Sequence, residues 1–128
     1  MRLLLDTHVF LWFISGDERL PSSWREAIRD PDNDVYLSVV SLWEAIIKSA
    51  VGKLPLPELA QTYIPIQRIR PQIESALLDE ASVQHLATLP GIHKDPFDRM
   101  LVCQAIEHDF TVVTVDEVFE KYPAPIFR

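Results

Sequence analysis

Two acidic residues in the sequence directly follow short apolar runs that are typical of buried β-strands. Asp6 comes after residues 3–5, and Asp116 comes after residues 112–115. The carboxyl ends of parallel strands lie at one edge of a sheet, and ligands collect beyond that edge. Both carboxylates are therefore predicted to lie at one ligand-binding edge. The alternative is a structural role in a turn or as a helix cap, which Asp116 could fill before Glu117.

A third acid, Asp98, lies at the predicted start of a helix. Asp95 suits the N-cap position of this helix, with Pro96 as its first residue. Asp98 falls on the same helix face as the apolar residues three, four and seven positions further along, and this face must pack on the sheet. An acid on such a face is costly unless a cation meets it. We therefore predict a functional role for Asp98 and a capping role for Asp95.

A fourth acid, Glu44, has two interpretations of equal weight. Ser41 and Glu44 have the spacing of a capping box, and Glu44 could also pair with Lys48 one helical turn further on. Both of these roles are structural. Alternatively, Glu44 shares a helix face with Ile47 and Val51, which would turn its carboxylate towards the interior.

Convergence of these acids would restrict the chemistry of the site. Two unit charges about 5 Å apart repel by roughly 3 kcal/mol at an effective dielectric constant of about 20, so clustered carboxylates must hold protons or cations. Oxygen donors without a matching set of histidine and cysteine ligands favour Mg²⁺ or Mn²⁺ over zinc. Such an ion can activate a bound water and neutralise charge on a phosphate. The acids expected as its ligands are Asp6, Glu44, Asp98 and Asp116.

The elements that would position these acids alternate between strands and helices. Branched apolar runs predict strands over residues 2–5, 35–39 and 111–115, and a weaker strand over residues 73–78. Helical patterns occur at residues 8–15, 23–29, 41–51, 58–67, 80–88 and 97–108. This alternation predicts an α/β fold, with a parallel sheet of four to five strands and helices on both faces. No linker or repeat interrupts the chain, so residues 1–128 are expected to form a single domain.

The amino-acid composition excludes some classes of protein. The 128 residues are 48% hydrophobic, which is enough for one ordinary core. The net charge of −7 excludes a basic coat for nucleic acid but leaves room for a local patch, such as Arg68 with Arg70. Cys103 is the only cysteine, and the apolar run at residues 3–5 is too short for a signal peptide or a membrane span. We expect a reduced, soluble, cytoplasmic protein without membrane association.

Several large apolar side chains have no clear place in this scheme. Trp43 is expected in the core. The others suit the core, a dimer partner or another protein equally well, and they are Trp12, Trp24, Leu54 and Leu56.

Four ordered motifs in the chain resemble those of PIN-domain ribonucleases. They are Leu4-Leu5-Asp6-Thr7-His8, Ser38-Val39-Val40-Ser41-Leu42-Trp43-Glu44, His93-Lys94-Asp95-Pro96-Phe97-Asp98-Arg99-Met100-Leu101 and Thr114-Val115-Asp116. Each motif is short, but their order at strand ends and helix starts is most similar to VapC-type toxins of bacterial toxin–antitoxin pairs. The resemblance implies a PIN-like three-layer sandwich and an endoribonuclease in which a water activated by Mg²⁺ or Mn²⁺ attacks the RNA backbone.

The resemblance also implies roles for individual residues and partners. The metal-binding acids would be Asp6, Glu44, Asp98 and Asp116, with Thr7, Asp95 and Thr114 as hydrogen-bonding or acidic groups around them. Apart from the resemblance, the candidate RNA contacts are His8, His93, Lys94 and Arg99, and the alternative for each is an ordinary hydrogen-bonded or solvated side chain. The implied partners are an RNA substrate, a second copy of the chain in a homodimer, and a VapB-like antitoxin whose tail lies in the groove beside the acids.

Three other functions fit parts of the sequence. His8 and His93 could cleave RNA by metal-free acid–base catalysis. Strand-end acids also occur in phosphotransfer domains, where an aspartate accepts a phosphoryl group. However, His8 stands where a dehalogenase-type enzyme needs a second aspartate, and Asp116 with Glu117 stand where a receiver domain needs a lysine. The third alternative is a non-catalytic acidic binding module, whose activity would survive substitution of the acids.

Overall fold

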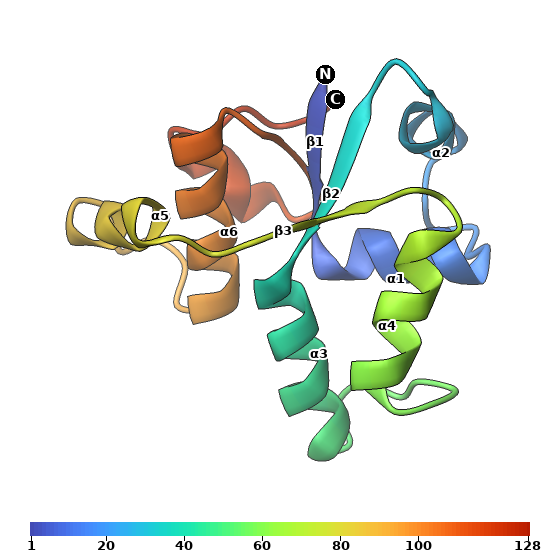
Figure 1. Cartoon of the computed structure of the whole chain (residues 1–128). Helices are drawn as coiled ribbons and strands as arrows, with labels where there is room; N and C mark the ends of the chain where they lie inside the picture. The colour runs from blue at the N-terminus through green and yellow to red at the C-terminus, as the bar shows by residue number, and fades with distance from the viewer.

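A computed structural model describes residues 1–128 and contains a four-stranded parallel sheet (Figure 1). Its strands are β1 (Arg2–Leu5), β2 (Asp34–Ser38), β3 (Glu74–Ala76) and β4 (Thr111–Val113). The strand order is β3-β2-β1-β4, and every neighbouring pair is parallel. The predicted α/β fold and the number of strands are confirmed.

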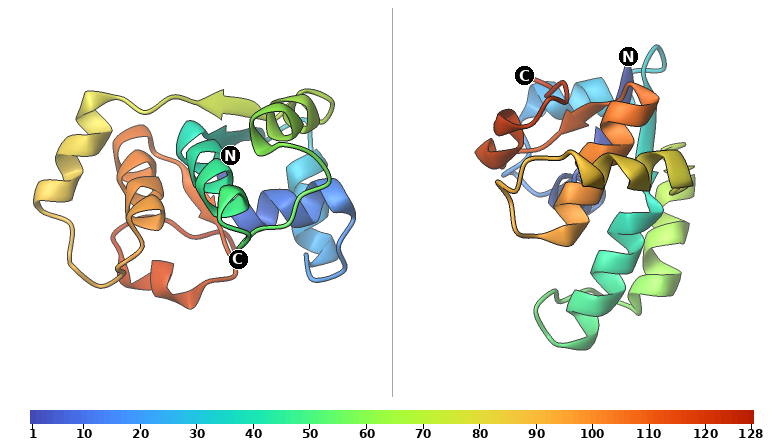
Figure 2. Two further views of the ribbon diagram at one scale, coloured as in Figure 1. Left: turned by 90° about the horizontal axis from the view of Figure 1, so that it is seen from below. Right: turned by 90° about the vertical axis from the view of Figure 1, so that its left-hand side faces the viewer.

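Helices cover both faces of this sheet. The α-helices are α1 (Thr7–Ser15), α2 (Ser22–Arg29), α3 (Val39–Ala50), α4 (Ala60–Ile69), α5 (Glu80–Gln84) and α6 (Pro96–His108), and the 3₁₀ helices are η1 (His85–Ala87) and η2 (Glu117–Lys121). α1, α2 and α4 lie on one side of the sheet and α5 and α6 on the other, as Figures 1 and 2 show. α3 and α4 pack together and project beyond the sheet. No helix combines the length and apolar character that crossing a membrane requires.

The central strand β1 explains why its sequence is a continuous apolar run. Leu3 and Leu5 are fully buried in the core beneath α1, α2 and α4, whereas Leu4 is fully buried in the core beneath α6. Successive side chains of a strand point to opposite faces, so a strand covered on both sides needs apolar residues at every position. The two cores hold β1, and with it the start of α1, in a fixed place.

The strand order places a ligand-binding edge between β1 and β4. The chain moves outward from β1 to β2 and β3, and then returns to form β4 on the other side of β1. Such a reversal is the point at which open α/β sheets leave a crevice beyond their carboxyl ends. Asp6 follows β1 at this crevice, and Asp116 follows β4 after two further residues.

The start of α3 differs from the sequence-based prediction. The helix begins at Val39, because the Ser38 hydroxyl accepts a hydrogen bond from the Val40 amide at 3.0 Å and acts as the N-cap. Ser41 therefore lies within the first turn and is buried. The capping box between Ser41 and Glu44 does not form, which removes one structural explanation for Glu44.

Smaller differences concern the ends of other elements. The predicted helix over residues 80–88 ends as an α-helix at Gln84 and continues as the 3₁₀ helix η1. The predicted helix over residues 58–67 is shifted to Ala60–Ile69. β4 ends at Val113, which leaves Thr114 and Val115 to lead the chain to Asp116.

Candidate active site

A cavity of about 360 Å³ opens at the carboxyl edge of the sheet, and the four expected acids line it together. Asp6 and Asp116 follow two strands, Asp98 lies in the first turn of α6 and Glu44 in the second turn of α3, so segments distant in sequence meet at this cavity. The residues that line it are Asp6, His8, Trp12, Glu44, Lys48, His93, Asp95, Asp98, Val115 and Asp116.

Hydrogen bonds from two threonines fix the buried acids. The Thr114 hydroxyl donates to Asp6 Oδ2 at 2.8 Å and accepts from the Asp116 amide at 3.0 Å, so it links the two strand-end acids. The Thr7 hydroxyl donates to Glu44 Oε1 at 2.7 Å. Both threonines are buried. Thr7 and Thr114 thus lie next to the acids and orient their carboxylates, in the positions that the resemblance implies for them.

Glu44 points into the cavity, but for a reason other than the predicted one. Glu44 is only 3% exposed, whereas Ile47 and Val51 are 48% and 64% exposed. The expectation that these three residues share an inward face was therefore wrong. The buried face of α3 instead contains Ser41 and Glu44, because the helix projects beyond the sheet and is covered on that face alone.

Trp43 is 54% exposed, so its predicted place in the core was also wrong. Its ring packs edge-on against Phe97 at a centroid distance of 4.9 Å. The side chain precedes Glu44 on α3 and points away from the buried face of this helix.

Lys48 places a positive charge at the acid cavity. Its Nζ lies 2.5 Å from Glu44 Oε2 and 3.6 Å from Asp95 Oδ2. Asp95 also caps α6, because its Oδ1 accepts a hydrogen bond from the Phe97 amide at 2.8 Å. The predicted pairing of Glu44 with Lys48 and the capping role of Asp95 are both confirmed, and Asp95 also belongs to the cavity lining.

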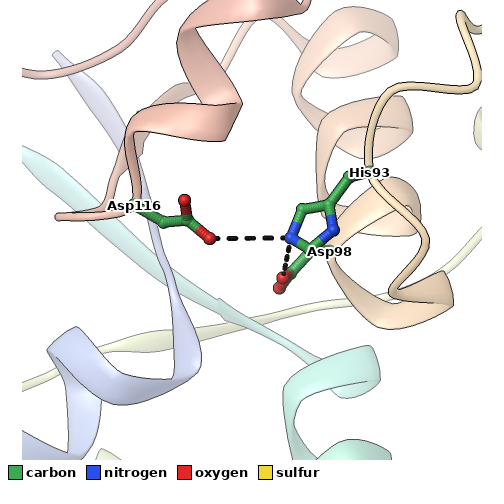
Figure 3. A group of neighbouring side chains, drawn as sticks. All are labelled: His93, Asp98 and Asp116. Carbon is green, nitrogen blue, oxygen red and sulfur yellow. Dashed lines mark ion pairs between the residues drawn. The ribbon is translucent and has the colours of Figure 1, made fainter.

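His93 lies between two of the acids. Its Nε2 is 2.8 Å from Asp98 Oδ2 and 3.5 Å from Asp116 Oδ2, and Figure 3 shows the ring directed at both carboxylates. The hydroxyl of Tyr122 accepts a hydrogen bond from the His93 amide at 2.6 Å and holds the loop that carries the ring. Sequence reasoning gave His93 as a candidate RNA contact or acid–base catalyst but not as a candidate metal ligand, although its position two residues before the cap of α6 brings it to the same edge as the acids.

Electrostatics make Asp98 and Asp6 unfavourable as anions. Burial, together with the charges of Asp6, Asp95 and Glu44, raises the pKa of Asp98 to about 8. Burial also raises the pKa of Asp6, although the hydrogen bond from Thr114 opposes this shift. Burial and the neighbouring carboxylates thus outweigh the positive charge of Lys48 at Asp98, and a bound cation would relieve the remaining repulsion.

The other basic residues predicted to contact RNA lie outside the lining of this cavity. Lys94 is exposed on the loop next to His93, and Arg99 donates a hydrogen bond to the Pro90 carbonyl at 2.8 Å. Arg70 lines a separate cavity of about 490 Å³, where α1, α2 and α4 end. Because α4 ends just before β3 begins, Arg68 and Arg70 belong to the amino edge of the sheet, opposite the acids.

The donor atoms fit a hard divalent cation. Two groups of side chains bring their donor atoms within 4.8 Å of one another: His93 with Asp98 and Asp116, and Glu44 with Asp95 and Asp98. Carboxylate oxygens dominate both groups, as magnesium and manganese sites require. Asp6 lines the same cavity, next to these groups.

Comparison with known proteins gives the family of the chain. The family model described as "PIN domain" matches residues 3–125. The chain belongs to the PIN domain family. This PIN domain is 26% identical over 128 residues to Ribonuclease VapC22 of Mycobacterium tuberculosis, and the match covers 97% of this chain and 95% of that protein.

Solved structures share the fold of this PIN domain. VapBC2 from Rickettsia felis, bound to a DNA fragment from its promoter, gives a TM-score of 0.72 at 21% identity and covers 100% of this chain and 98% of the matched chain. DNA-bound VapBC from Salmonella typhimurium gives a TM-score of 0.69 at 21% identity, with 100% and 97% of the two chains covered. The predicted PIN-like three-layer sandwich is thereby confirmed.

Proposed function

We propose that this PIN domain is a metal-dependent endoribonuclease that acts as the toxin of a toxin–antitoxin pair. The observation that carries this function is the convergence of Asp6, Glu44, Asp98 and Asp116 in one cavity at the carboxyl edge of the sheet. The similarity to Ribonuclease VapC22 along nearly the whole chain supports the same function. We take residues 1–128 to act as one catalytic domain.

The four acids would line the cavity that holds Mg²⁺ or Mn²⁺. When bound, such an ion supplies a water of lowered pKa and neutralises charge that develops on the phosphate. Thr7 and Thr114 fix the carboxylates of Glu44 and Asp6 through the hydrogen bonds described above. Asp95 contributes a further carboxylate on the side of Lys48. These contacts hold the acids in position before the ion binds.

RNA would approach from the open side of the cavity. His8 is exposed at its rim, and His93 lines it, so both are within reach of a phosphate or base at the acids. Lys94 lies on the loop before α6 and Arg99 in the first turn of this helix, and both are proposed to contact the RNA backbone further along the RNA strand. Such contacts would compensate for the net charge of −7, which opposes the approach of a polyanion.

A VapB-like antitoxin would bind next to the acids. A neighbouring cavity of about 380 Å³ shares His8 and Trp12 with the acid cavity and continues along Leu54, Leu56 and Tyr63. Its apolar walls suit the side chains of a peptide that then covers the acids. The similar structures from Rickettsia felis and Salmonella typhimurium are VapBC proteins, which supports a partner of this class.

A homodimer is proposed on the basis of α3. This helix and the residue that follows it expose a group of large apolar side chains, which are Trp43, Ile46, Ile47 and Val51. A cluster of large exposed apolar side chains is more often an interaction surface than a surface that stays in contact with water. A second copy of the chain would bury them.

Cleavage of RNA by the purified protein tests the proposed enzyme. We expect total RNA to be cut in Mg²⁺ or Mn²⁺ and to remain intact in EDTA, and we expect Asp6→Asn to abolish cutting in either metal. Equal cutting in EDTA would support acid–base catalysis by the histidines. Transfer of phosphate onto the protein without RNA cleavage would support a phosphotransfer domain, and RNA binding that survives Asp6→Asn without cleavage would support a binding module.

A further inference from the structure

The acid cavity contains two groups of possible metal ligands that meet at Asp98. Glu44 and Asp95 complete one group, and His93 and Asp116 complete the other. A basic nitrogen lies at each group. Lys48 Nζ contacts Glu44 and Asp95, two of the three acids of the first group, and His93 Nε2 lies between Asp98 and Asp116, the two acids of the second. The two nitrogens differ in chemistry, and this difference decides where a divalent ion can bind.

The ammonium group of Lys48 occupies the first group as a cation. It lies 2.5 Å from Glu44 Oε2 and 3.6 Å from Asp95 Oδ2, and 30% of its side chain is exposed. Lys48 and Glu44 are four residues apart on α3, so the helix backbone keeps both in this relation. An ammonium group has three donor hydrogens and no lone pair, so it cannot become a metal ligand. A divalent ion in this group would instead meet a like charge.

The imidazole of His93 leaves the second group open to an ion. A neutral imidazole carries a lone pair on one ring nitrogen, so it can ligate an ion or move aside without placing a like charge next to it. His93 is also carried by a loop outside the helices, and Figure 3 shows its ring next to Asp98 and Asp116. Neither of these carboxylates forms an ion pair with a lysine or arginine. The second group therefore offers a divalent ion two carboxylates without a fixed positive charge.

We propose that this active site binds one divalent ion per chain, at Asp98 and Asp116, and that the ammonium group of Lys48 takes the place of a second ion beside Glu44 and Asp95. A phosphate bound in the cavity would then contact the ion on one side and Lys48 on the other. Lys48 is thus a positioning and substrate-binding cation within the catalytic site. This inference rests on the proposed metal dependence of the enzyme.

Counting bound Mn²⁺ tests this division of the site without any RNA. The free ion is followed by electron paramagnetic resonance while metal-free protein is titrated with Mn²⁺. We expect one ion per chain in the unmodified protein, two in Lys48→Met, and one in Lys48→Arg, which retains the positive charge. Lys53→Met is the matched control, because it removes an exposed charge on the loop after α3 that does not line the acid cavity, and it should leave the count at one.

Different results separate the failure of this inference from the failure of the proposed function. Two ions in the unmodified protein, or one or none in Lys48→Met, would overturn the role of Lys48 and leave metal-dependent cleavage intact. No binding of Mn²⁺ by the unmodified protein would overturn both. Thermal melts of each variant show whether it is folded, and the count for the unmodified protein decides the question even where Lys48→Met does not fold. We further expect Lys48→Met to lose at least tenfold in RNA cleavage while it gains an ion, a combination that a purely structural lysine would not produce.

Discussion

Asp98 and Asp79 are both aspartates at the start of a helix, yet their surroundings have opposite effects. Asp79 caps α5, where its Oδ1 accepts a hydrogen bond from the Ser82 amide at 2.9 Å and its Oδ2 lies 2.7 Å from His108 Nε2. Hydrogen bonds from Ser82, with a further contribution from His108, lower the pKa of Asp79 to about 2. Burial and neighbouring carboxylates raise the pKa of Asp98 to about 8.

This contrast separates acids that stabilise the fold from acids that serve the site. Asp79 has dedicated donors, so the folded protein favours its charged form. Asp98 lies among other carboxylates, and the helix terminus and His93 do not compensate for them. Ionisable side chains whose charged form is disfavoured in a cleft are typical of functional sites, because a bound ligand or ion can offset the repulsion between them. The same substitution at the two positions should therefore have opposite consequences.

The largest expected difference is in catalysis. Asp98→Asn should lower RNA cleavage by roughly 10³-fold or more, about 4 kcal/mol in transition-state stabilisation, because it removes a metal-binding carboxylate. Asp79→Asn is the matched control and should keep cleavage within about twofold of the unmodified protein, since α5 does not line the acid cavity. Initial rates on one labelled RNA in saturating Mg²⁺ measure both. Similar losses in the two variants would show that Asp98 acts through the fold.

A bound metal ion should raise the Tm of the protein through Asp98, and this rise should not depend on Asp79. An ion that binds only the folded state, at a free concentration of about 100 times its dissociation constant, adds about 2.7 kcal/mol to the free energy of unfolding. For a domain of this size, this corresponds to a rise in Tm of roughly 10 °C. Melts with and without Mn²⁺ measure this rise. Asp79→Asn should retain it and Asp98→Asn should lose most of it. An equal rise in both variants would place the ion away from Asp98.

The positions of the two acids that follow strands could be predicted from the sequence, because the carboxyl ends of parallel strands lie at one edge of the sheet. A run of branched apolar residues identifies a buried strand, and parallel strands share their carboxyl edge, so the edge at which Asp6 and Asp116 lie could be predicted although β4 ends two residues earlier than its apolar run. The inward position of Asp98 came from helical periodicity on α6, which packs on the sheet along its length. In each case a large, continuous core determined the orientation of the acid.

The features of α3 could not be predicted in the same way, because this helix leaves the sheet. Periodicity identifies the apolar face of a helix, but it does not say whether the rest of the protein covers that face. Trp43 and Ile47 are apolar and exposed, while Glu44 is charged and buried. The place of Lys48 at a cation position depends on Asp95, which comes from a distant segment, and no local pattern contains that information.

Removal of the Asp98 charge should stabilise the metal-free protein. Asp98→Asn leaves a side chain of similar size and ends the repulsion from Asp6, Asp95 and Glu44, so the free energy of unfolding at pH 8 should rise by about 1 to 2 kcal/mol. This figure is smaller than the full shift in pKa implies, because Asp98 is partly solvated and its interactions are screened. Urea unfolding in EDTA measures the change. A decrease of similar size would mean that the charge of Asp98 supports the fold.

The unfavourable charge of Asp98 should also make the stability of the metal-free protein depend on pH. The pKa of Asp98 rises from 3.8 to about 8 on folding, so the folded protein retains a proton that the unfolded chain releases. The resulting stabilisation is complete below about pH 4 and is lost as the pH rises to about 8. Urea midpoints of the metal-free protein should therefore fall across this range, and the fall should be weaker in Asp98→Asn. Identical slopes in the two proteins would assign the titration to another group.

The smallest expected effect is a loss of stability in Asp79→Asn, opposite in sign to the gain expected for Asp98→Asn. Asp79→Asn removes a charge that two donors stabilise, so the variant should melt at a slightly lower temperature than the unmodified protein, without metal and with it. The pKa of Asp79 falls from 3.8 to about 2 on folding, so its contribution is present above about pH 4 and is lost as the pH falls to about 2. Melts at pH 7 and pH 2 should therefore differ less for the variant than for the unmodified protein. A higher Tm at pH 7 for Asp79→Asn would mean that the charge of Asp79 destabilises the fold, as the charge of Asp98 does. The pKa of an aspartate at the start of a helix would then not distinguish acids of the active site from acids that stabilise the fold.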